Sequence, residues 1–201
     1  TFMLTSQVNS TDIFVCKLTT DGELVWAKQF QGNQPHFGGV GYDIAVNAIG
    51  EVYTTGTIGG TVDFDPGMAV FNLTSSVPNN TESYLSKLDA NGNFSWAKAM
   101  GPGEGNALAV NDQGEVYTGG STSPGYMPRI KKLDTSGQLL WEKELGGNDA
   151  QSITLDASGN VYISGDRITT RGPMKLFHDA MNAIKPSVPN AGPKSGTTTL
   201  Q

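Results

Sequence analysis

The side chains that most often carry out catalysis are few in this sequence and stand far apart. The chain has two histidines, His36 and His178, and one cysteine, Cys16. A zinc site needs Cys and His at short spacings, and a hydrolase triad needs a nucleophile beside its base. Neither arrangement can be built from these three residues, and no Gly-rich phosphate loop leads from a strand into a helix. We therefore predict no catalytic residue, no cofactor and no enzymatic activity.

Carboxylates are the remaining side chains whose spacing could hold a cation. Asp63 and Asp65 alternate with phenylalanine ahead of a Pro-Gly pair, and alternating oxygens suit calcium. The distal bidentate glutamate of a complete calcium loop is missing. A similar pattern recurs at Asp89, Asp134 and Asp156, where an aspartate three residues before a glycine is expected to cap its own turn. We predict no metal site, and the cation question stays open for Asp63 and Asp65 alone.

Two short modules alternate along the first 166 residues. One has Lys-Leu, a glycine four residues beyond the leucine, and a tryptophan four residues further on. The other has Gly, then Glu or Asn, then Val-Tyr. The tryptophans are Trp26, Trp96 and Trp141, and the tyrosines are Tyr53, Tyr117 and Tyr162. The last two tryptophans and the last two tyrosines are each 45 residues apart, while insertions around 31–41 and 57–81 lengthen the first tryptophan interval to 70.

Each module has the pattern of a β-hairpin. Apolar residues at alternate positions predict half-buried strands, and the small-polar–Gly joints between them suit hairpin turns. Two hairpins every 45 residues make a four-stranded antiparallel unit, a period typical of a β-propeller blade. We therefore predict an all-β fold of propeller blades, with the repeated Trp and Tyr packed between them. Alternation is expected to turn Lys17, Lys87 and Lys132 outward, and Cys16 is expected to be a small buried residue.

The repeat also defines the predicted domain organisation. Residues 1–168 form the propeller region, with a partial blade at 1–30, whole blades at 42–100 and 105–146, and a half blade at 150–166. This makes about three blades, whereas closed propellers have roughly four to eight. We expect the chain to be part of a larger propeller, and the alternative is a ring closed by several copies.

The segment 169–201 departs from the repeat. Apolar residues at helical spacing lie between Pro173 and Pro186, which predicts a helix over 173–185. The remainder is rich in Pro, Gly, Ser and Thr, as expected of an extended tail. The helix is expected to pack on the open end of the blades, and the alternative is that it joins copies in an assembly.

The repeated pattern resembles a known family. Lys-Leu-Asp-x-x-Gly-x-x-x-Trp-x-Lys followed by Asp-x-x-Gly-Asn/Glu-Val-Tyr-x-x-Gly is similar to the SBBP-type β-propeller repeat of bacterial exported proteins, over roughly residues 1–166. The segment 133–141 also resembles the Asp-x-x-Thr-Gly-x-x-x-Trp motif of quinoprotein-type propellers. The SBBP-type resemblance implies an extracellular or cell-surface location, although the chain contains no signal-peptide pattern, and it implies an architecture without a particular activity.

Composition and charge exclude several classes of partner. The formal net charge is −6 without a cluster of Lys and Arg, so we predict no nucleic-acid partner. No run of about 18 apolar residues occurs, which predicts no membrane span. A protein or glycan partner, or self-assembly, fits the sequence better.

Three functions compete at this point. The preferred one is a non-catalytic exported or cell-surface scaffold that binds protein or glycan. The second is a subunit of a filament or surface assembly joined through the 169–201 tail. The third is a quinoprotein-like oxidoreductase, which typically needs a vicinal cysteine pair, whereas this chain has one cysteine.

Overall fold

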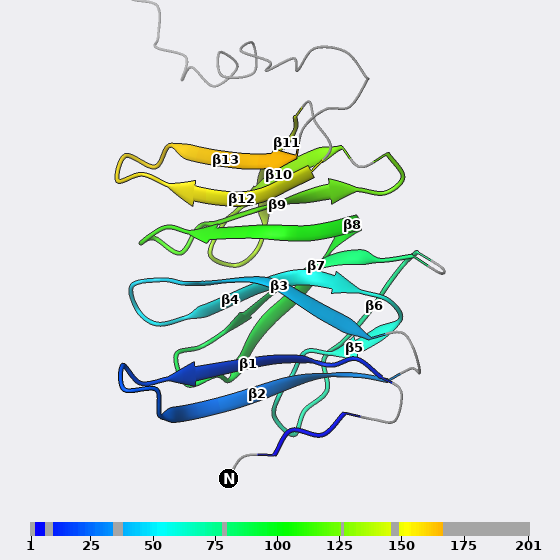
Figure 1. Cartoon of the computed structure of the whole chain (residues 1–201), viewed down its shortest axis with the longest axis vertical. Coiled ribbons are helices and arrows are strands. Elements are labelled where there is room, and N and C mark those ends of the chain that lie inside the picture. The colour runs from blue at the N-terminus through cyan, green and yellow to red at the C-terminus, as the bar shows by residue number, and fades with distance from the viewer. Residues whose placement is uncertain are drawn as a thin grey trace, which may run out of the picture.

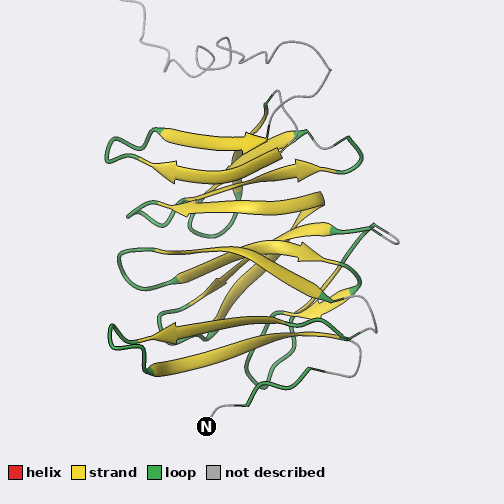
Figure 2. Ribbon diagram, in the orientation of Figure 1, coloured by secondary structure: helices red, strands yellow, loops and turns green. Residues whose placement is uncertain are grey.

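The computed structural model describes residues 3–6, 10–33, 38–77, 80–125, 127–145 and 149–166, in which the regular secondary structure is entirely β-strand. Figures 1 and 2 show the strands arranged as a stack of layers. The strands are β1 (Ile13–Leu18), β2 (Leu24–Gly32), β3 (Gly39–Val46), β4 (Val52–Ile58), β5 (Thr61–Asp63), β6 (Asn72–Thr74), β7 (Glu82–Leu88), β8 (Phe94–Val110), β9 (Val116–Thr122), β10 (Pro128–Leu133), β11 (Leu139–Glu144), β12 (Asp149–Leu155) and β13 (Val161–Asp166). The all-β prediction is confirmed for this part of the chain. The helix expected over 173–185, the tail after it and both histidines lie outside the described residues.

Two antiparallel meanders form the centre of the stack. The first meander consists of β3, β4, β7 and the start of β8, and the second consists of the end of β8, β9, β10 and β11. Strand β8 belongs to both, because it pairs with β7 over residues 94–102 and with β9 over residues 103–110. The two meanders therefore follow each other along the chain with no loop between them.

One hairpin lies at each end of the stack, as Figure 1 shows. The N-terminal hairpin, β1–β2, is extended on its β2 side by the short strands β5 and β6 of the 57–81 insertion. The C-terminal hairpin, β12–β13, is a two-stranded sheet of its own. The outer edges of β1 and β13 have no strand paired to them in the described part of the chain.

Each pair of neighbouring layers encloses an apolar core. Between the N-terminal hairpin and the first meander, the ring of Phe64 lies 4.9 Å from that of Phe30 and 4.8 Å from that of Tyr84, and all three are fully buried. The core between the two meanders is built around Tyr53, and the core beside the C-terminal hairpin around Tyr117. The repeated tyrosines of the two meanders thus lie between layers, as predicted.

The Lys-Leu…Trp hairpins share one register. Each lysine lies opposite the tryptophan of its own module, and the pairs are Lys17–Trp26, Lys87–Trp96 and Lys132–Trp141. The prediction that these lysines point outward is correct for the exposed Lys17 and wrong for Lys87 and Lys132, which lie against a carboxylate from another hairpin. Cys16 is exposed rather than buried, because no described layer covers its face of β1.

Candidate functional site

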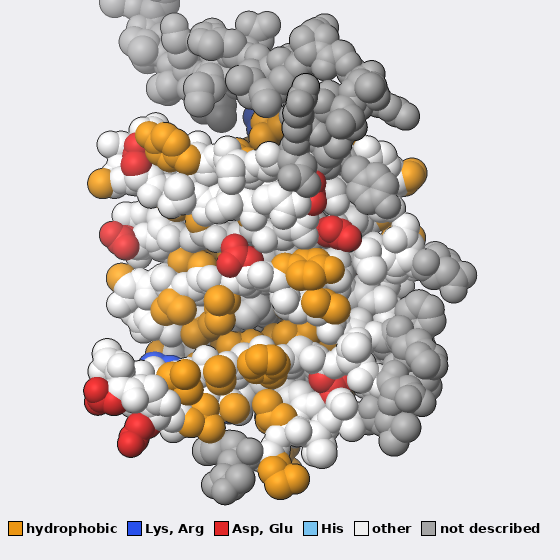
Figure 3. Space-filling view, viewed as in Figure 1, with side chains coloured by type: hydrophobic (Ala, Val, Ile, Leu, Met, Phe, Trp, Pro, Cys, Tyr) orange, Lys and Arg blue, Asp and Glu red, His pale blue; other side chains and the backbone are white. Residues whose placement is uncertain are grey.

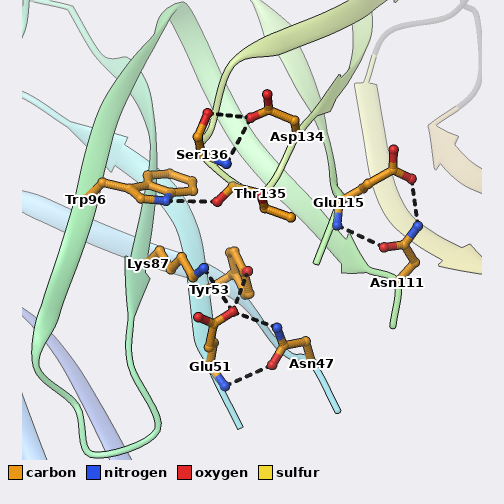
Figure 4. A network of polar contacts seen from close by, with 10 residues as sticks. All are labelled: Asn47, Glu51, Tyr53, Lys87, Trp96, Asn111, Glu115, Asp134, Thr135 and Ser136. Atoms are coloured by element: carbon orange, nitrogen blue, oxygen red, sulfur yellow. Dashed lines mark hydrogen bonds and ion pairs between the residues drawn. The ribbon is translucent and has the colours of Figure 1, made fainter. Parts of the chain in front are cut away.

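Four polar side chains, those of Asn47, Glu51, Tyr53 and Lys87, interact at one end of the first meander and are called the polar quartet. Glu51 is its centre. Its Oε2 atom accepts hydrogen bonds from Asn47 Nδ2 (2.7 Å) and Tyr53 OH (3.2 Å), and it forms an ion pair with Lys87 Nζ (2.9 Å), as Figure 4 shows. Lys87 Nζ also lies 5.4 Å from the centre of the Tyr53 ring, within the range of a cation–π contact. One carboxylate therefore joins the β3–β4 turn to β4 and β7.

The second meander repeats this quartet at the corresponding positions. Glu115 Oε2 accepts a hydrogen bond from Asn111 Nδ2 (2.8 Å) and pairs with Lys132 Nζ (2.7 Å). Lys132 Nζ lies 5.2 Å from the centre of the Tyr117 ring. Sequence reasoning found the Gly-Glu-Val-Tyr module but missed the quartet. The recurrence of Asn four residues before Glu, in the turn that leads into Val-Tyr, is the signal that could have identified it.

Both ion pairs keep their charges despite burial. Burial raises the pKa of Glu51, but hydrogen bonds from Lys87 and Asn47 outweigh this effect and leave the pKa below its ordinary value. The hydrogen bond from Lys132 is the largest effect on Glu115, whose pKa is also lowered. Burial lowers the pKa values of Lys87 and Lys132, yet their bonds to the glutamates outweigh it and both pKa values are raised. Charge compensation across the strand pair is therefore what allows these lysines to turn inward.

A tryptophan and a lysine of one layer hold a turn of the next layer. Trp96 of the first meander donates from Nε1 to the carbonyl oxygen of Thr135 (3.4 Å), and Lys98 Nζ donates to the carbonyl oxygen of Gly137 (2.7 Å). Both acceptors lie in the β10–β11 turn, which Asp134 caps by accepting two backbone N–H groups. The Trp-x-Lys and Asp-x-x-Gly sequences of neighbouring layers thus meet in one contact, the turn clamp.

The turn clamp is also present one layer earlier. Trp26 Nε1 donates to the carbonyl oxygen of Ala90 (3.4 Å). Gly92 in the same turn is so close to β2 that an added Cβ atom would lie 2.8 Å from Lys28 Cε. Trp141, the third tryptophan, packs against Tyr117 with ring centres 6.1 Å apart, but no described residue supplies it with a turn to hold.

A groove opens at the position of this missing turn, between the second meander and the C-terminal hairpin. It has a volume of about 600 Å³. One wall carries Glu115, Tyr117 and Lys132 of the second quartet, and the other wall is the turn at 155–159. The groove is the candidate functional site of this chain.

In each complete meander the corresponding position is filled by the second turn of the same meander. An added Cβ at Gly50 would lie 3.2 Å from the Cβ of Ala90, and one at Gly114 would lie 3.3 Å from Cγ2 of Thr135. At Gly159, which occupies the same place beside the groove, no described atom lies within 4 Å. The groove therefore lies at the position that a hairpin turn occupies in each meander.

The C-terminal hairpin carries three of the four side chains of a third quartet. Asp156 Oδ2 accepts hydrogen bonds from Asn160 Nδ2 (2.7 Å) and Tyr162 OH (3.1 Å). The amide and the carboxylate have exchanged places relative to the meanders, and the hydrogen bond from Asn160 is the largest of the effects that lower the pKa of Asp156. No lysine accompanies this set among the described residues.

Asp63 and Asp65, the candidates for a cation site, accept backbone hydrogen bonds within the 57–81 insertion. Asp63 Oδ1 accepts the backbone N–H groups of Asp65 (3.0 Å) and Phe71 (2.8 Å), and Asp65 Oδ1 accepts that of Gly67 (2.7 Å). These bonds hold the loop that places Phe64 in the first core. Within the described residues, no three His, Cys, Asp or Glu side chains gather as metal ligands, and no helix is long and apolar enough to cross a membrane.

Comparison with known proteins finds similarity to solved structures alone. No family model matches the chain, and no curated protein matches it. A crystal structure of a protein of unknown function from Bacteroides caccae is similar with a TM-score of 0.31 and 12% sequence identity, over 71% of this chain. The similar region is 57% of that protein, so the chain spans little more than half of its length.

Proposed function

We propose that the chain is a series of β-propeller-type blades and acts as a non-catalytic scaffold, exported or at the cell surface, that binds protein in the groove. One observation carries this proposal. At both inner interfaces the position that corresponds to the groove is occupied by a hairpin turn of the next layer, with Ala90 or Thr135 at its tip. In the described part of the chain, the groove therefore lacks a turn contact that the chain makes twice with itself.

The repeated residues support a scaffold. Each quartet joins the strands of one meander, and each turn clamp joins one layer to the next. The resemblance of the same sequence pattern to SBBP-type repeats supports the blade architecture and the exported location. In repeat proteins each unit is stabilised mainly by its neighbours, as the quartets and turn clamps stabilise these layers.

The walls of the groove favour a peptide over a glycan. At the interface between the meanders a tryptophan N–H and a lysine ammonium bind main-chain carbonyl groups of a turn, and at the preceding interface a tryptophan N–H does so. Trp141 and Lys143 form the Trp-x-Lys sequence of the second meander, and Trp141 packs against Tyr117 of the groove wall, so we expect both to reach a turn bound in the groove. A hairpin with an Asp/Thr-x-x-Gly turn is the ligand that these donors match.

A binding measurement tests this proposal. A cyclic hairpin peptide with the sequence of residues 130–141 is titrated into a dilute solution of the chain, and a panel of soluble glycans is titrated in parallel. Saturable peptide binding that weakens at least tenfold in Trp141→Ala is expected. A peptide with the turn residues scrambled is the control. Binding of glycans alone, absence of peptide binding, or peptide binding that Trp141→Ala leaves unchanged would each overturn the proposal.

A further inference from the structure

We infer that the groove receives the N-terminal hairpin of a second copy of this chain, and that two copies close a ring through two such contacts. This inference rests on the proposed blade architecture, because it treats β12–β13 of one copy and β1–β2 of the other as halves of one four-stranded layer. Strand edges, polar groups, turns and apolar faces at the two ends of the stack complement one another.

The free strand edges belong to strands that pair in both meanders. Strand β13 corresponds to β4 and β9, which carry Val-Tyr, and β1 corresponds to β7 and β10, which carry Lys-Leu. In the meanders β4 pairs with β7 and β9 with β10, and each places tyrosine opposite lysine. The same register would set Tyr162 of one copy opposite Lys17 of the other, so that a complete antiparallel layer is formed.

The polar quartet is divided between the two ends in a matching way. Asp156, Asn160 and Tyr162 lie at the C-terminal end of the stack with no described lysine beside them, and Lys17 lies exposed at the N-terminal end. No described side chain forms an ion pair or hydrogen bond with Lys17. Pairing of β13 with β1 would place the Lys17 ammonium over the Tyr162 ring, as in the complete quartets, and near the Asp156 carboxylate, which accepts the Tyr162 hydroxyl. Opposite charges therefore favour this union.

The two parts of a further turn clamp, a turn and a tryptophan, lie at opposite ends of the described stack. The β1–β2 turn ends in Gly22, around which no described atom lies within 4 Å of an added Cβ, whereas Gly92 and Gly137 in the equivalent turns touch the preceding layer. Among the described residues, no turn is held by Trp141. A second copy would bring its β1–β2 turn into the groove, beneath Trp141 and Lys143.

Apolar side chains are exposed where this union would cover them. On the outer face of β1, Leu18 is 53% exposed although its counterpart Leu88 is fully buried. On β3, Ile44 is 51% exposed, whereas its counterparts Leu108 and Ile153 are 5% and 7% exposed. Figure 3 shows apolar side chains gathered over these two layers. In the proposed ring β1 would lie against the second meander of the partner, and β3 against the partner's C-terminal hairpin.

Two copies satisfy the geometry that one copy does not. The two end hairpins lie at opposite ends of the stack in Figure 1, so one chain does not unite its own halves. The described part of each chain supplies two complete meanders and two half layers. The described parts of two chains thus give about six layers, within the four to eight of closed propellers, and a two-fold arrangement buries both ends of the described stack at once.

Light scattering after gel filtration measures the assembly directly. The 201-residue chain, whose mass is 21.2 kDa, is expected to elute with twice this mass. Lys17→Glu should raise the dissociation constant at least tenfold, because it places a carboxylate beside Asp156, while Lys17→Arg should leave the dimer intact. A monomeric natural chain, or a dimer that Lys17→Glu does not weaken, would overturn the inference.

A disulfide between two copies tests the proposed register of β13 on β1. Cys16 corresponds to Ser86, whose hydroxyl lies 2.7 Å from that of Thr54, and Ile163 corresponds to Thr54. The variant Ile163→Cys should therefore oxidise to a covalent dimer through Cys16, and Ser95→Cys, at an exposed position in β8, serves as the control. A ladder of higher species would overturn the closed ring, and cross-linking no better than the control would overturn the shared layer. In either case, hairpin-peptide binding that depends on Trp141 would leave the proposed function standing.

Discussion

The inner layer interfaces and the two outer ends of the stack contain equivalent residues in different surroundings. Tyr53 is fully buried between the meanders, whereas its counterpart Tyr162 is 56% exposed. Leu88 is fully buried, whereas its counterpart Leu18 is largely exposed. The burial of each residue thus depends on whether a neighbouring layer covers it, and not on its own hairpin. The hairpins carry the contacts of a complete layer even where no described layer receives them.

The largest difference between the two regions is expected for leucine. In a dilute, monomeric sample Leu88→Ala should lower the free energy of unfolding by about 2–5 kcal/mol, because it leaves a cavity beneath a complete layer. Leu18→Ala should lower it by about 1 kcal/mol or less, since its side chain is already largely in solvent. Urea titrations followed by circular dichroism measure both. Equal losses would contradict the view that layer contacts set these energies.

The lysines should show the same contrast with smaller effects. Lys87→Ala removes the cation that compensates Glu51 and should cost about 1–3 kcal/mol in the free energy of unfolding. Lys17→Ala should cost no more than about 0.5 kcal/mol in the monomer. The double variant Lys87→Met with Glu51→Gln is the control. It should recover part of the loss, because no unpaired charge remains at the site.

Low pH should reduce the stability of the meanders, because protonation removes the charges of Glu51 and Glu115. The pKa values of Glu51 and Glu115 are lower in the folded chain than the ordinary value of 4.5, so their contribution is fully present above that value. It is lost as the pH falls through the lower folded pKa values. Unfolding free energies measured below pH 4.5 should therefore fall more steeply for the natural chain than for Glu51→Gln with Glu115→Gln. Parallel pH profiles would show that the quartets do not stabilise the meanders.

The hairpins could be predicted from the sequence because their signals are local. Alternation along β7 and β10, and the Asp-x-x-Gly turns, are visible within a dozen residues. The inward direction of Lys87 could not be predicted in this way, because its partner Glu51 comes from a hairpin about 36 residues earlier in the chain. Strand alternation gives the face of a side chain, and the tertiary partner decides whether that face is charged or apolar.

The groove was beyond the reach of the sequence for a related reason. Its walls have a sequence pattern similar to that of the inner interfaces, and its main difference is that no described turn lies beside Gly159. The exposure of Cys16 has the same origin, since an apolar strand pattern predicts burial on both faces only when both neighbouring layers are present. A repeat sequence describes each unit well and says little about which unit lacks a neighbour.

Two glycines give the finest test of the comparison. Gly114 and Gly159 hold the same turn position with φ values of +81° and +80°, so alanine should cost about 1–2 kcal/mol at either from backbone strain alone. In the monomer Gly114→Ala should cost up to about 1 kcal/mol more, because its Cβ would lie 3.3 Å from Thr135. Light scattering should then show that Gly159→Ala, and not Gly114→Ala, weakens the dimer. If Gly159→Ala dimerises as tightly as the natural chain, the partner's turn does not lie beside Gly159.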